Sequence, residues 1–123
     1  MRNAFTVTNV TRGRCVAARV WLADRWWSRL RGLLGRSPLG EGEGMMLMPC
    51  KAVHMLGMRY PIDVAFLDRQ GGVVATYHRL EPGARSHWHR QAALALELRA
   101  GTLQHTETRT GDALQWRPSP EAA

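Results

Sequence analysis

The sequence of 123 residues has little cysteine, and its two cysteines stand far apart, at Cys15 and Cys50. Two cysteines are too few for a disulfide framework, and no C-x-x-C pair of the kind found in structural zinc sites is present. We therefore expect neither a fold held by several disulfides nor a structural metal ion, and nothing in the composition points to a cofactor.

Long apolar runs are also absent. No stretch approaches the roughly 18 apolar residues that would predict a membrane-spanning helix. The first twenty residues, MRNAFTVTNVTRGRCVAARV, lack the apolar region of a secretory signal peptide. These absences predict a cytoplasmic protein without a membrane span.

Lysine is nearly missing, because Lys51 is the only one among 17 basic residues. The arginines are scattered along the chain and give a formal net charge of +7. A basic surface attracts nucleic acid, acidic proteins and anionic membranes. No helix-turn-helix, zinc-finger or RNA-recognition signature accompanies the charge, so we expect no specific nucleic-acid partner.

What remains has the composition of one globular domain, with 45% hydrophobic and 22% charged residues. We expect the domain to span residues 1–117 and to be followed by a flexible tail at 118–123, where prolines and small residues gather.

Short segments with strand-like patterns, separated by turns, dominate the chain. In residues 61–67, Ile62, Val64 and Phe66 are predicted to face one way while Asp63 and Leu67 face the other. The predicted strands are 4–10, 15–23, 45–48, 61–67, 73–80, 92–98 and 113–116, with another short extended piece at 53–58. About seven or more strands of this kind predict a mainly β fold, either a compact sandwich or a partly closed barrel.

One helix is predicted, from an N-cap at Asp24 to about Gly35. Its apolar residues fall within one arc and its arginines lie outside that arc. The pattern suits a helix that covers the core with its apolar face, and we favour this interpretation over a helix lying on a membrane surface.

The stretch PCKAVHMLGMRYPIDVAFLD, residues 49–68, carries the candidate chemistry. In an extended chain, four residues place the Cα atoms of Cys50 and His54 about 13 Å apart, too far to share a metal ion unless the chain bends. Cys50 is a nucleophile only if folding brings a base such as His54 to it; otherwise it is an inert buried thiol. The nearby methionines suit copper(I), but gap-filling core residues of this type are more common.

Asp63 is the most informative residue, because apolar neighbours flank it on both faces of its predicted strand. A buried carboxylate requires partners, and we expect Arg59, His54 or main-chain amides after a bulge to provide them. The favoured interpretation is a structural carboxylate; the alternative is a small-ligand pocket. The sequence identifies no catalytic residue. The candidate ligand-binding residues are Cys50, His54, Met58, Arg59 and Asp63.

Several blocks, in order, resemble the family called domain of unknown function 192. They are GLLGR, GEGMMLMPCKAVHMLGMRYPIDVAFLD, GVV, LEPGAR, LELRAG and GD, between residues 32 and 112. The resemblance covers roughly residues 16–116 and is strongest in the branch with P-C-x-x-V-H-x-x-x-M-R-x-P-I-D. It implies a compact β-sandwich with a covering helix and no established catalytic mechanism; by analogy it suggests an accessory role near pilus or secretion systems.

Three functional hypotheses follow. The first is a non-enzymatic binding or accessory module that contacts a protein or a small anionic ligand. The second is a metal- or thiol-dependent enzyme built on Cys50, His54 and Asp63. The third is nonspecific polyanion binding through the basic surface.

Overall fold

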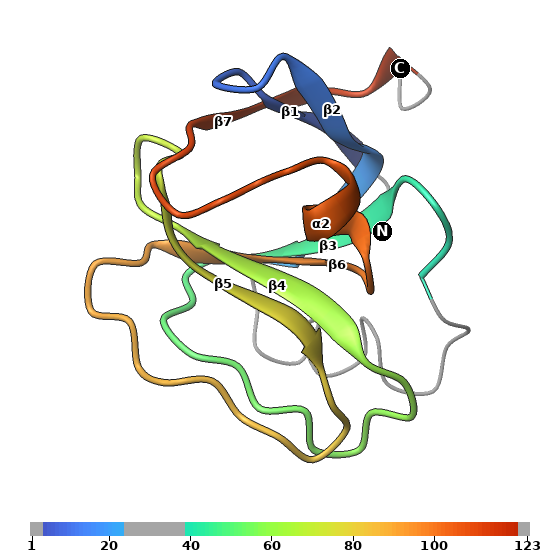
Figure 1. Ribbon diagram of the computed structural model, residues 1–123, viewed down its shortest axis with the longest axis vertical. Coiled ribbons are helices and arrows are strands. Elements are labelled where there is room, and N and C mark those ends of the chain that lie inside the picture. The colour runs from blue at the N-terminus through green and yellow to red at the C-terminus, as the bar shows by residue number, and fades with distance from the viewer. Residues whose placement is uncertain (1–3, 24–38, 121–123) are drawn as a thin grey trace.

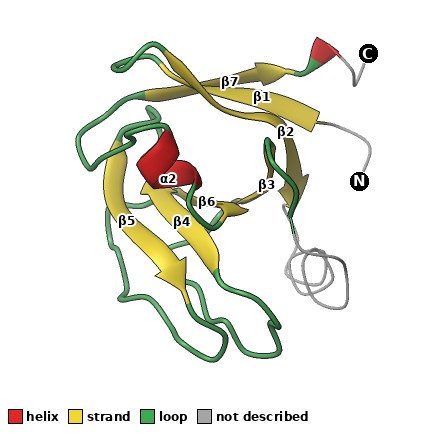
Figure 2. Ribbon diagram, turned by 45° about the vertical axis from the view of Figure 1, so that its right-hand side comes forward, coloured by secondary structure: helices red, strands yellow, loops and turns green. Residues whose placement is uncertain are grey.

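The computed structural model describes residues 4–23 and 39–120, and these residues form a strongly curled sheet (Figures 1 and 2). Its seven strands are β1 (Ala4–Asn9), β2 (Arg14–Ala23), β3 (Glu43–Leu47), β4 (Ile62–Leu67), β5 (Val73–Leu80), β6 (Leu94–Arg99) and β7 (Leu114–Pro118), and one short helix, α2 (Thr102–His105), follows β6. The mainly β prediction is confirmed. The helix predicted from Asp24 to Gly35 lies outside the described residues.

The strand order is β5-β4-β6-β3-β2-β1-β7. Strands β2 and β3 pair in parallel, while the other neighbours pair antiparallel. An isolated bridge between Gly72 and Ala113 connects the β4–β5 turn to the start of β7, so the two ends of the sheet meet there. The result is a partly closed barrel.

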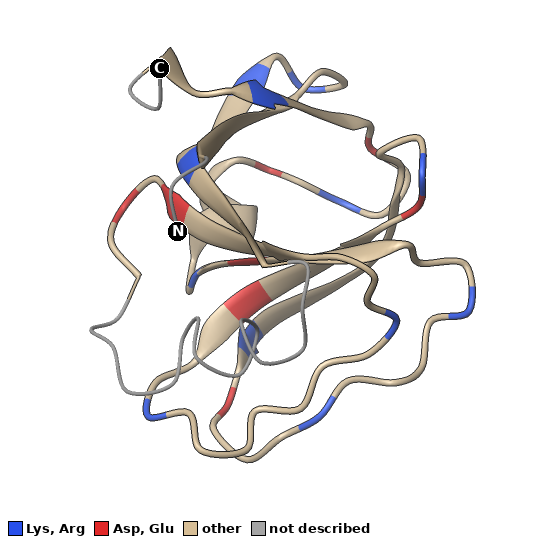
Figure 3. Cartoon of the chain, turned by 180° about the vertical axis from the view of Figure 1, so that it is seen from behind, with Lys and Arg blue, Asp and Glu red and all other residues tan. Residues whose placement is uncertain are grey.

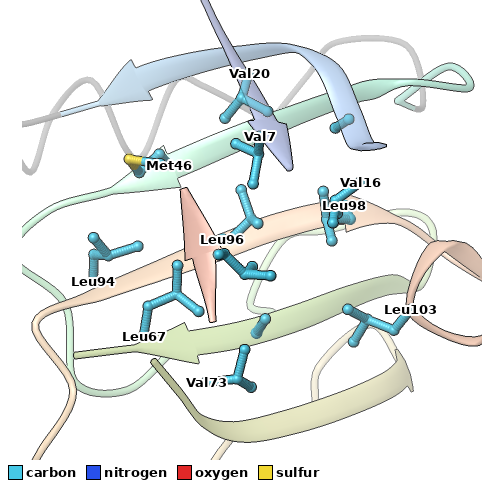
Figure 4. Packing of buried hydrophobic residues seen from close by; sticks show 13 residues of the cluster. Val7, Val16, Val20, Met46, Leu67, Val73, Leu94, Leu96, Leu98 and Leu103 are labelled. Atoms are coloured by element: carbon cyan, nitrogen blue, oxygen red, sulfur yellow. The ribbon is translucent and has the colours of Figure 1, made fainter. Parts of the chain in front are cut away.

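Two apolar clusters lie on opposite faces of the sheet. The inner cluster contains Leu67, Leu94, Leu96, Leu98 and Leu103 together with residues of the other strands (Figure 4). The outer cluster contains Ile62, Val64 and Phe66 of β4, with residues of β3 and of the long loops. Because both faces are covered, all six residues of β4 are buried. The alternation predicted for this strand is confirmed.

The C-terminal boundary differs from the prediction. Strand β7 continues through Pro118, and buried Ser119 donates its main-chain N–H to the Ala4 carbonyl oxygen at 2.9 Å. Pairing with β1 therefore carries the folded part beyond residue 117, where composition alone suggested that the tail begins.

Candidate functional site

Asp63 lies on β4 with no exposed surface, and its carboxylate accepts three main-chain hydrogen bonds. Arg79 donates to Oδ1 at 2.9 Å, while Gly101 and Leu103 donate to Oδ2 at 3.0 and 2.9 Å. The Arg79 donor sits where β5 carries one extra residue opposite β4, with φ of 53°. The expectation of main-chain amides after a bulge is confirmed at this residue.

The other two donors come from the start of α2. Gly101 precedes the helix with φ of 96°, a conformation that favours glycine. Because the N-cap residue is glycine, it has no side chain that could accept a hydrogen bond from the first turn of the helix. Asp63 accepts the N–H groups that such a helix start leaves without partners. Its role in the structure is to hold the β5 bulge and the β6–α2 turn against β4.

The remaining candidate residues lie elsewhere. His54 and Arg59 are exposed, and His54 forms an isolated bridge with Arg85. Cys50 is buried in the outer cluster, and Met58 packs against that cluster, whereas Asp63 shares the opposite face of β4 with Ala65 and Leu67. The sheet thus separates Asp63 from Cys50 and Met58.

The thiol of Cys50 has a local partner, because its Sγ donates to the Ala52 carbonyl oxygen at 3.1 Å. Met45 and Met55 lie in the outer cluster and Met46 in the inner one, so the methionines do not form one thioether set. Within residues 4–23 and 39–120, no group of three or more His, Cys, Asp or Glu side chains is placed to hold a metal ion.

Two long loops, residues 48–61 and 81–93, run side by side below the sheet (Figures 1 and 2). Main-chain hydrogen bonds join them along their length: Met55 donates to Ala84, Ser86 to Val53 and His89 to Lys51, at 2.8–2.9 Å. Lys51 adds two bonds from Nζ, to the carbonyl oxygens of Arg90 and Ala92, both at 2.7 Å. The pairing fixes both loops over the outer cluster.

An aromatic group anchors the second loop to the sheet. The ring of His89 lies 4.7 Å from that of Phe66, and its Nε2 is 2.6 Å from the Tyr77 hydroxyl, which also accepts the His87 N–H at 3.0 Å. Burial, with the neighbouring His87, lowers the pKa of His89 and favours its neutral form. Residues 87 and 88 are exposed, whereas the ring of His89 packs inward against Phe66 and Tyr77.

Two large apolar side chains project from these loops instead of packing. Leu56 and Trp88 are each 71% exposed. The loops carry four basic residues, Lys51, Arg59, Arg85 and Arg90, against one acidic residue, Glu81, and Figure 3 shows the cations spread along both loops. We call the exposed surface of residues 48–61 and 81–93 the loop face.

Asp112 forms a second buried polar network. Its carboxylate accepts bonds from Arg12 Nε and Nη2, Asn9 Nδ2 and the Arg109 N–H, at 3.0–3.1 Å. Burial alone would raise the pKa of Asp112, but these bonds, with the Arg12 charge, lower it to about 2. The network joins the β1–β2 turn to the segment before β7. No local sequence pattern predicts that these distant residues interact.

Two shallow hollows elsewhere on the described surface do not include the predicted site. They are lined by Arg69, Gln70, Leu114, Gln115, Trp116 and Arg117, and by Arg14, Gly101, Gln104, His105 and Glu107. In the second hollow, Arg14 pairs with Glu107 at 3.1 Å. Among the described residues no helix is long and apolar enough to cross a bilayer.

Comparison with known proteins places these features in a family. A UPF0127 protein of Thermococcus sibiricus is 28% identical over 118 residues, covering 92% of this chain and 75% of the relative. A protein of unknown function from Novosphingobium aromaticivorans has a similar crystal structure, with a TM-score of 0.78, 25% identity, and coverage of 92% of this chain and 84% of that one.

A second crystal structure, from Sinorhizobium meliloti, has a TM-score of 0.76 at 24% identity and covers 93% of this chain and 92% of that one. Its name proposes a role in transcription regulation for that protein, and the likeness shows the fold alone. The model of the DUF192 family, described as an uncharacterised ACR, matches residues 7–116. The chain therefore belongs to the DUF192 family.

Proposed function

We propose that the protein is a non-enzymatic binding module that attaches to an anionic partner through the loop face. The observation that carries the proposal is the exposure of Trp88 and Leu56, each 71% exposed, among basic side chains. Single exposed apolar residues are common on protein surfaces, so the proposal rests on the position of these two large side chains among cations on one surface of the paired loops.

The types of residue support this proposal. Tryptophan and arginine contribute most strongly to binding where they become buried against a partner. Hydrogen bonds between the loops hold the face in one conformation, so little conformational entropy is lost on binding. An excess of cations speeds association with anionic partners and disfavours basic ones.

The alternative of an enzyme built on Cys50, His54 and Asp63 has less support. The Asp63 carboxylate is already held by three main-chain donors, and the sheet lies between it and Cys50. A base for the Cys50 thiol would need to lie beside it, whereas His54 is exposed at the loop face. The accessory role in pilus or secretion systems suggested by the resemblance remains a prediction.

Affinity capture tests the proposal. The protein is immobilised, and the proteins and lipids that it retains are quantified. We expect Arg59→Ala and Trp88→Ala each to reduce capture at least about fivefold, or about 1 kcal/mol, without changing the unfolding midpoint. Val10→Ala is the matched control, since Val10 is also exposed, at 44%, and lies in the β1–β2 turn at the opposite end of the molecule (Figure 1). Equal capture by all three variants and the wild type would refute the role of the loop face.

A further inference from the structure

The two apolar side chains of the loop face stand apart from each other. Leu56 follows Met55, which bonds to Ala84 and Gly83, whereas Trp88 precedes His89, which bonds to Lys51. Four residues separate positions 51 and 56 along the paired loops, a distance of at most about 17 Å when the chain is extended. A protein partner would need a separate pocket for each side chain, but a lipid interface accepts each one independently.

The polar groups of the loop face suit the same kind of partner. Main-chain N–H and carbonyl groups of one loop form hydrogen bonds with those of the other, and the Lys51 ammonium donates to two carbonyl oxygens. These polar groups would therefore keep their partners if the loops entered a less polar environment. Arg59, Arg85 and Arg90 are exposed and free to reach lipid phosphates. Tryptophan is enriched where hydrocarbon meets headgroups.

A second copy of the chain is a poor match for this surface. The net charge is +7, and the two loops alone carry four cations against one acid, so two loop faces would repel each other. An anionic bilayer instead presents the complementary charge over an area of any size.

We infer that the loop face binds the surface of an anionic membrane, with Trp88 and Leu56 entering the interfacial layer and Arg59, Arg85 and Arg90 contacting lipid phosphates. This inference rests on the proposed function and names its partner. In this arrangement the loop face lies on the surface of the bilayer.

Vesicle sedimentation tests the inference with phosphatidylcholine vesicles, with or without phosphatidylglycerol. We expect binding only to the anionic vesicles, weakened by added salt. Trp88→Ala should reduce the partition coefficient about tenfold, equivalent to about 1.4 kcal/mol, and Leu56→Ala should reduce it less, while Val10→Ala should leave it unchanged.

Charge reversal separates the loop face from the overall charge. Arg85→Glu with Arg90→Glu lowers the net charge by four, from +7 to +3, and so does Arg69→Glu with Arg117→Glu at exposed positions outside the loop face. We expect the first pair to abolish vesicle binding and the second to weaken it only about twofold to threefold.

Three results would overturn the inference. They are no binding to anionic vesicles, binding that Trp88→Ala leaves unchanged, and equal losses for the two charge-reversed pairs. If vesicles fail to bind while Trp88→Ala still reduces capture of a protein, the lipid is the wrong partner and the binding function stands.

Discussion

A single carboxylate connects three parts of the chain, because the two oxygens of Asp63 receive N–H groups from Arg79, Gly101 and Leu103. Burying an ionised carboxylate is costly unless hydrogen bonds replace its water, and three donors do so here. The bonds also satisfy N–H groups at a bulge and at the start of a short helix, where regular pairing is interrupted. Asp63 therefore holds these three parts of the chain together, and we expect its main contribution to be to stability.

Asp63→Asn tests this role with little change in shape. The new amide NH₂ would face N–H donors, so at least one buried main-chain donor would lose its acceptor, and we expect a loss of about 2–4 kcal/mol in the free energy of unfolding. Urea denaturation measures the loss. Glu41→Gln, at an exposed position, is the control and should stay within about 0.5 kcal/mol of the wild type; similar losses for both variants would contradict the structural role of Asp63.

At the scale of the residue, the sequence predicted that Asp63 needs hydrogen-bond donors and that main-chain amides could provide them, but it did not predict which residues these are. Apolar neighbours on both sides of Asp63 require a buried carboxylate to find donors, and amides after a bulge were among those expected. Gly101 and Leu103 lie 38 and 40 residues further along the chain, and no local pattern specifies contacts at that separation. Arg59 and His54 are near in sequence, but their side chains are exposed.

Among the elements, the junction between the β4–β5 turn and β7 closes the sheet. Leu114 donates to the Gly71 carbonyl oxygen at 2.9 Å, and Val73 donates to that of Asp112 at 2.8 Å. Gly71 has φ of 89°, and a Cβ atom there would overlap the Leu114 carbonyl oxygen. The junction therefore needs glycine at this position for its backbone conformation and for space.

The free energy of unfolding of Gly71→Ala tests how much the junction contributes to stability, and Gly13→Ala is the matched comparison. Gly13 also has positive φ, at 68°, but has open space around it, so Gly13→Ala should cost only the backbone strain of about 1 kcal/mol. We expect Gly71→Ala to exceed that cost by about 2 kcal/mol, because the junction must open to admit the methyl group. Equal unfolding free energies for the two variants would show that the contact between Gly71 and Leu114 does not limit closure.

The Asp112 network makes a second connection between distant elements, and it depends on pH. The folded-state pKa of Asp112, about 2, lies below its ordinary value of 3.8, so the folded form releases this proton more readily than the unfolded chain does. The stabilisation is complete above about pH 4 and is lost as the pH falls toward 2, with a magnitude of about 1–2 kcal/mol after allowance for solvent screening.

Denaturation at several pH values, with Asp112→Asn alongside the wild type, isolates this contribution. The variant should be less stable at pH 7 by roughly 1–3 kcal/mol, and the difference between the two proteins should shrink between pH 4 and pH 2. A difference that stays constant over this range would mean that Asp112 does not supply the pH dependence.

Element positions were more predictable than element partners. The alternation in residues 62–67 follows from side-chain geometry within one strand, and it correctly divides β4 between the two clusters. The parallel pairing of β2 with β3 and the placement of β6 between β3 and β4 depend on contacts across the whole sheet. The four-residue helix α2 is too short to show a helical period.

For the whole molecule, the curled sheet buries two clusters and leaves the paired loops at one end as a separate surface. The net charge of +7 predicted attraction to polyanions, but it could not show where a partner would bind. In the structure, Trp88 and Leu56 point outward on the loop face, among its basic residues. They do so because their neighbours turn inward toward the sheet, namely Val53, Met55 and His89. Inward and outward directions in irregular loops follow from packing and not from sequence period.

Photo-crosslinking in cells tests the loop face most directly, with benzoylphenylalanine in place of Trp88 or, as a control, in place of Val10. We predict a discrete adduct, with lipid or protein, from position 88 that is absent from position 10 and decreases when Arg59→Ala is added. The same diffuse products from both positions, unaffected by Arg59→Ala, would contradict the loop face as the binding surface.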